Sequence, residues 1–85
     1  MTNYFEQRPL ERIDYVQSLV KDTIASATAS IAPSGPTLDP VCITDSEATV
    51  RVSDVAAGVL YTLTFHIVGA SGQEWHPPTQ IRGIR

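Results

Sequence analysis

The sequence predicts an all-β fold, a small antiparallel β-sandwich of six to seven strands with an extended N-terminal arm. Residues 59–67 alternate strictly, with Val59, Tyr61, Leu63, Phe65 and Ile67 on one face. Other short alternating stretches follow one another, separated by turns at a spacing of about 8–12 residues. The composition is rich in Thr, Ser, Val, Ala, Gly and Pro, which favour strands and turns.

Length and composition bound the kinds of protein that this chain can be. Its 85 residues make one domain, in which we assign residues 1–12 to the arm and residues 13–85 to the sandwich. The net charge of −3 argues against binding to nucleic acid. Cys42 is the only cysteine, which excludes an intrachain disulfide. With no long apolar run and no signal-peptide pattern at the start, we expect a soluble protein made in a reducing cytoplasm, without a membrane partner.

The first twelve residues carry Tyr4, Phe5 and Leu10 among polar residues, with Pro9 interrupting any period. One interpretation is a frayed terminus. The other is an arm that becomes ordered on a neighbouring subunit and binds it through these three side chains. For the binding arm we expect that deletion of residues 1–10 leaves the fold intact and abolishes incorporation into the assembly.

Residues 12–20 fit two patterns. As a strand, Ile13, Tyr15, Gln17 and Leu19 share a face; as a helix, residues 10, 13, 16 and 20 do, with Pro9 suited to the first turn. We favour the strand, because every later segment reads as β.

The middle of the chain continues the strand pattern. Residues 23–31 place Ala25, Ala27, Ala29 and Ile31 on an inner face of small side chains, with Ile24 joining at the start. Residues 37–44 are interrupted by Pro40, which confines them to a sheet edge or a bulge. In residues 48–53, apolar side chains at 48, 50 and 52 alternate with polar ones and predict a half-buried strand.

After the central strand, residues 69–72 form a hairpin turn and residues 73–75 return as a strand that Pro77-Pro78 breaks. Residues 79–85 are either the last strand or an extension. Tyr61, at the start of the central strand, is either a tyrosine corner or a core aromatic.

Trp75, His76, Pro77 and Pro78 are the best local candidate for a partner-binding patch, since an aromatic beside rigid prolines gives a preorganised apolar surface. The alternative is a tryptophan that closes one end of the core. Two terminal arginines, at 82 and 85, could dock on an acidic partner.

The search for chemistry finds no catalytic or metal-binding pattern. His66 and His76 are the only histidines, and Asp54 and Glu74 would be near them only by chance, so we expect no metal and no cofactor. A Ser-His-Asp catalytic triad could be assembled from Ser53 or Ser71 with His66 and Asp54. The sequence has no nucleophile-elbow motif and no oxyanion loop to support it. We therefore expect no catalytic residues and no enzyme.

Three segments in order carry a family resemblance: Pro9 through Ile13-Asp14-Tyr15, then residues 22–28 (DTIASAT), then residues 48–62 leading to Gly72. Together they resemble small immunoglobulin-like virion proteins of tailed bacteriophages, of the fibre–tail adaptor or decoration type. The family often has a tryptophan shortly after the Leu-Asp-Tyr segment, whereas this chain has Gln17-Ser18-Leu19.

The resemblance implies an immunoglobulin-like sandwich that is a non-enzymatic part of a virion. We expect an adaptor that attaches fibres to the tail or neck, in symmetric copies and in contact with other virion proteins. One alternative is a capsid decoration or cement protein bound to the major capsid protein. Another, from a different class, is a glycan-binding module using Trp75, Tyr61 and the end loops.

Overall fold

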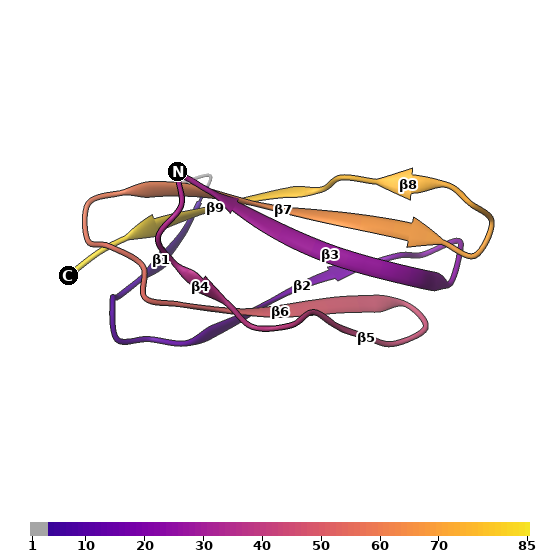
Figure 1. Ribbon diagram of the computed structural model, residues 1–85, viewed down its shortest axis with the longest axis horizontal. Helices are drawn as coiled ribbons and strands as arrows, with labels where there is room; N and C mark the ends of the chain where they lie inside the picture. Colours follow the sequence, from indigo (N-terminus) through magenta and orange to yellow (C-terminus); the bar gives the residue numbers. More distant parts are fainter. Residues whose placement is uncertain (1–3) are drawn as a thin grey trace.

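The computed structural model describes residues 4–85, and two facing β-sheets account for the regular structure in that range (Figure 1). The strands are β1 (Phe5–Gln7), β2 (Ile13–Ser18), β3 (Ile24–Ala32), β4 (Thr37–Leu38), β5 (Cys42–Ile43), β6 (Glu47–Ser53), β7 (Leu60–Gly69), β8 (Glu74–Trp75) and β9 (Pro78–Gly83). The five-stranded sheet has the order β1-β9-β7-β3, with β8 also paired to β7. The four-stranded sheet has the order β2-β6-β4, with β5 also paired to β6. The predicted β-sandwich is confirmed. No helix capable of crossing a membrane is found between residues 4 and 85.

Prolines divide two of the ribbons into short strands. Strands β4 and β5 flank Pro40 and both pair with β6. Strands β8 and β9 likewise flank Pro77 and pair with β7 in one register. Proline has no N–H to donate to a ladder, so each ribbon is interrupted where it occurs. Counted as ribbons, the described strands number seven, within the predicted range.

The core lies between the sheets and is organised around β7. Four alternate side chains of this strand, Tyr61, Leu63, Phe65 and Ile67, are at most 3% exposed, as the sequence pattern predicted. Val59 precedes the strand and is only partly buried. Full burial of a large apolar side chain contributes about 1.5–3 kcal/mol, so this row is a major source of stability. The other buried apolar residues are Tyr15, Ile24, Ala48, Val50, Val52, Val55 and Ile81.

Strand β2 settles the ambiguity of residues 12–20. It is antiparallel to β6, with Tyr15 opposite Val50, and the helical alternative is wrong. Tyr15 is buried, and Ile13 and Gln17 beside it in the alternation are partly buried, so the predicted face is the inner one.

Strand β3 departs from the predicted alternation at its start. Its register against β7 shifts between Ile24 and Ser26, which is a β-bulge. Because a bulge adds one residue, it changes which face the following side chains occupy. Ile24 and Ala27 can therefore both face the core, whereas Ala25, predicted to be on the inner face, is exposed.

The N-terminal segment is extended as predicted, but it lies within the sheet. Strand β1 pairs in parallel with β9, with Phe5 beside Ile81 and Gln7 beside Gly83. Residues 79–83 in turn pair with β7, so they form the last strand of the domain. The division into an arm of residues 1–12 and a sandwich of residues 13–85 stays a prediction, but the structure shows residues 5–7 hydrogen-bonded into the larger sheet.

Tyr61 combines the two roles considered for it. Its ring is buried, and its hydroxyl accepts a 3.0 Å hydrogen bond from the backbone N–H of Ala56, five residues upstream. A tyrosine corner makes such a bond at the start of strand F in immunoglobulin-like domains, where strands B, E and D face C, F and G. Strands β2, β6 and β4 facing β3, β7 and β9 are compatible with this arrangement. The immunoglobulin-like class itself remains a prediction.

Candidate functional site

The three arm residues predicted to bind a partner lie in different surroundings. The Tyr4 hydroxyl accepts a 3.2 Å hydrogen bond from Nη1 of Arg82, whose guanidinium lies 5.8 Å from the centre of the Tyr4 ring. The Phe5 ring packs edge-on against Tyr15, with ring centroids 5.7 Å apart, and remains 60% exposed. Leu10, in the connection between β1 and β2, is 97% exposed. Phe5 and Leu10 therefore offer apolar surface to a partner, whereas Tyr4 already has a partner within the chain.

The important arm residue that sequence reasoning missed is Gln7. Its side chain is fully buried, accepts a 2.8 Å hydrogen bond from the Tyr15 hydroxyl, and donates to the carbonyl oxygens of Val52 (2.9 Å) and Glu11 (3.1 Å). These bonds tie β1 in the larger sheet to β2 and β6 in the smaller one. A single polar residue in a short extended segment carries no pattern that distinguishes burial from exposure, so the sequence offered no signal for it.

The predicted patch of residues 75–78 is divided between the two faces of the larger sheet. Trp75 lies opposite Ile67, and Pro77 accepts a 3.1 Å hydrogen bond through its carbonyl from the N–H of Phe65. Both are partly buried, and Trp75 packs against the core. His76 and Pro78 are exposed on the opposite, outer face because strand side chains alternate. The structure therefore does not form one surface from these four residues.

A groove beside Trp75 marks one end of the sandwich. It is formed where the connection from β2 to β3 passes the returning strand β8, and Val20 on its rim is 92% exposed. The residues lining it are Ser18, Leu19, Val20, Lys21, Gln73 and Trp75. An exposed apolar rim above a partly buried tryptophan is suited to contact with an apolar segment of a partner. We call this surface the tryptophan groove.

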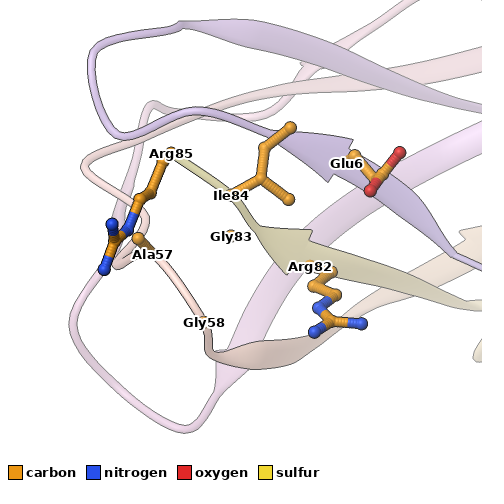
Figure 2. A pocket seen from close by; sticks show the side chains of 7 residues that line it. All are labelled: Glu6, Ala57, Gly58, Arg82, Gly83, Ile84 and Arg85. Atoms are coloured by element: carbon orange, nitrogen blue, oxygen red, sulfur yellow. The ribbon is translucent and has the colours of Figure 1, made fainter.

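The opposite end of the sandwich has a recess beside the C-terminus (Figure 2). Figure 2 shows the loop of Ala57 and Gly58 facing the C-terminal residues across it. Arg82 and Arg85 bring two guanidinium groups to this surface and Glu6 brings one carboxylate, in a chain whose net charge is −3. The residues lining the recess, which we call the arginine recess, are Glu6, Ala57, Gly58, Arg82, Gly83, Ile84 and Arg85.

Gly83 makes the close packing at this recess possible. Its carbonyl accepts from the N–H of Gly58 (2.7 Å), and its N–H donates to the carbonyl of Val59 (2.8 Å). A Cβ at position 83 would collide with the backbone carbonyl of Ala56. The tail is further held because Arg8 Nε donates a 3.1 Å hydrogen bond to the carbonyl of Arg85. The recess is therefore built from backbone held in fixed positions.

The hairpin turn after β7 is held by Asp22. Its Oδ2 accepts a 2.6 Å hydrogen bond from the Ser71 hydroxyl, and its Oδ1 accepts one of 2.8 Å from the N–H of Thr23. These bonds, the Ser71 hydroxyl first, lower the pKa of the Asp22 carboxyl below its ordinary value. A turn fixed in this way holds the strand that carries Trp75 in place.

The triad considered from the sequence is not assembled. Asp54 accepts a 2.9 Å hydrogen bond from the Thr37 hydroxyl, and Ser71 donates to Asp22. His66 contacts Glu74 and stacks on His76, the predicted partner-binding residue, on the outer face of the larger sheet.

Together, the elongated β-sandwich and the surface features at its two ends indicate a class of protein, a small structural module that contacts other proteins. Comparison with known families identifies the class more closely. The family model for podophage GP4 fiber-tail adaptor protein gp77 matches residues 7–80. The chain belongs to this family of fibre–tail adaptors, and the sequence resemblance to phage adaptors is confirmed. A search of curated proteins found no match.

Membership of this family makes the chain a structural component of a tailed-phage particle. A fibre–tail adaptor binds tail and fibre proteins, so these are its partners, and it is part of the virion.

Proposed function

We propose that the chain is a non-enzymatic adaptor that holds one virion partner at each end of its long axis. The observation that carries this proposal is the separation of the two end surfaces. The described chain measures 41 × 27 × 17 Å. Strand β7 runs ten residues between the arginine recess, near Leu60, and the tryptophan groove, near Gly69. At about 3.3 Å per residue, the two surfaces are about 30 Å apart. Two partners can thus be bound at once without touching each other.

The chemistry of the two surfaces differs, which suits two different partners. The arginine recess suits an acidic segment, because arginine makes directed hydrogen bonds with carboxylates. The tryptophan groove suits an apolar segment. The exposed side chains of Phe5 and Leu10 lie outside both surfaces and extend the contact area along the β1–β2 edge. Among the predicted site residues, we propose Phe5, Leu10 and Trp75 as partner contacts.

We further propose that copies of the chain occupy symmetric positions on the tail or neck, and that they are assembled there after synthesis in the host cytoplasm. No nucleic acid or membrane is needed for this role. The family match is to a tail adaptor, so it supports the tail over the capsid-decoration alternative. No described feature specifically favours glycan binding.

The test separates the two ends by charge-changing variants of exposed residues. Arg82→Glu with Arg85→Glu alters the recess, and Val20→Asp alters the groove; Ser30→Asp, on the exposed outer face of β3, is the control. Binding of each purified variant to the purified tail and fibre proteins is measured, after melting curves show that the variants are folded. Each end variant should lose one partner and retain the other, and the control should retain both. Binding of both partners by both end variants would contradict the proposal.

A further inference from the structure

His66, Glu74 and His76 form a cluster of metal-ligating side chains that is separate from both end surfaces. Strands β8 and β9 pair with β7 in one register, in which Val68 lies opposite Glu74 and Thr64 opposite Pro78. If the same register continues through residues 76 and 77, which lie between β8 and β9, His66 is directly opposite His76. The hydrogen bond from the N–H of Phe65 to Pro77 shows that the strands stay together there.

The geometry brings three ligand atoms close together. The two imidazole rings are stacked, with centroids 4.5 Å apart and planes inclined by 24°. Nε2 of His66 lies 2.5 Å from Oε1 of Glu74. One ligand atom from each residue can be chosen so that all three lie within 4.8 Å of one another. Because all three side chains are exposed, small rotations that bring these atoms about 2 Å from a shared ion meet little steric resistance.

From this arrangement we propose that the outer face of the β7–β8 hairpin binds a divalent transition-metal ion, zinc above all, through His66, His76 and Glu74. Two imidazoles and one carboxylate form a ligand set that zinc uses in proteins when one coordination position stays open. Imidazole ligands favour zinc, copper and nickel over calcium and magnesium, which prefer oxygen alone. Water fills the open position, which faces solvent.

The backbone of the site is well suited to hold an ion. His66 lies on β7, and His76 lies in the two-residue gap between β8 and β9, both of which pair with β7. The Ser71–Asp22 bonds fix the turn that joins β7 to β8. The two histidines become neighbours because their strands pair across a hairpin, and this needs no fixed spacing between them along the sequence. The sequence spacing of the histidines therefore predicted no metal site here. The site does not depend on the proposed adaptor role.

The experiment is a titration of the purified, chelator-treated chain with zinc chloride, followed by calorimetry and by melting curves. We expect one bound ion per chain and a higher melting temperature with zinc, since a ligand that binds only the folded state stabilises it. His66→Gln, His76→Gln and Glu74→Gln should each weaken zinc binding at least about 10-fold. Cys42→Ser controls for the exposed thiol, and Thr64→Ala controls for the same sheet face; both should bind zinc like the wild type.

A cobalt(II) titration adds a spectroscopic readout that a purely structural role of the histidines would not change. The wild-type chain should give the visible absorption of cobalt in a site of low coordination number, and the His66→Gln/His76→Gln double variant should not. Equal zinc affinity in the wild type and the double variant would overturn the proposal. So would the absence of any heat or melting shift at millimolar zinc.

Discussion

The hydroxyl of Tyr15 donates a 2.8 Å hydrogen bond to Oε1 of Gln7, and both side chains are buried between the two sheets. Gln7 belongs to the segment that sequence reasoning treated as a detachable arm. Its other two hydrogen bonds, to the carbonyls of Val52 and Glu11, complete its hydrogen-bonding at that position. The N-terminal segment therefore takes part in the core, and its removal has consequences for the fold.

Gln7→Leu should lower the free energy of unfolding by about 1–3 kcal/mol, because it leaves the buried Tyr15 hydroxyl without its acceptor and removes the side-chain bond to the Val52 carbonyl. Urea unfolding measures the change, and Gln80→Leu, on the exposed face of β9, is the matched control. Deletion of residues 1–10 should be at least as destabilising, contrary to the expectation from sequence. A deleted chain with an unchanged unfolding midpoint would show that the Gln7 bonds do not matter for stability.

Alkaline pH should destabilise the protein through Tyr15. Burial, with a smaller contribution from the Glu11 carboxylate, raises the pKa of Tyr15 to about 12, whereas an unfolded tyrosine titrates near pH 10. Between these values the unfolded chain loses a proton that the folded chain keeps, so the stabilisation is complete below about pH 10 and is lost as the pH rises towards 12. The loss reaches about 2 kcal/mol.

Urea unfolding at a series of pH values between 9 and about 11.5 measures this loss. Tyr15→Phe is less stable at neutral pH, because Gln7 loses a donor, but its stability should fall less steeply with rising pH. Parallel curves for the two proteins would assign the alkaline loss to other groups.

Gly83→Ala should be strongly destabilising, because the new Cβ would meet the fixed backbone carbonyl of Ala56. We expect a loss of about 3 kcal/mol or more, at the upper end of what overpacking costs. Gly72→Ala is the comparison: there φ is +91°, but no atom lies within 4 Å of the added Cβ, so only the backbone conformation opposes it, at about 1–2 kcal/mol. Thermal melting ranks the two, and a smaller loss at position 83 than at 72 would refute the steric argument.

Phe65→Ala should cost about 3–5 kcal/mol, since the ring is completely buried at the centre of β7. Leu60→Ala, on the same strand but 49% exposed, should change stability by less than about 1 kcal/mol. Denaturant unfolding of the two variants compares the two faces of the strand directly. Similar losses would mean that the inner and outer faces are not distinguished energetically.

The strands and their faces were largely predictable, because alternation of apolar and polar side chains is a local property. It located β7 and its inward row, the half-buried strand β6, and the effect of Pro40. Where the backbone breaks the period the prediction failed: the bulge at the start of β3 turned Ala25 outwards. The order of three sequence segments also showed a resemblance to phage adaptors, and the family match confirms that resemblance.

By itself, then, the sequence determined the fold class, the central strand and the family, because these follow from local periodicity and the order of residues along the chain. Only the tertiary structure decided that Gln7 is a core residue, that residues 75–78 divide between two faces, and that His66 meets His76 and Glu74. Each of these depends on which strands become neighbours and in which register. Such pairing is set by long-range packing and hydrogen bonds, which no short stretch of residues encodes.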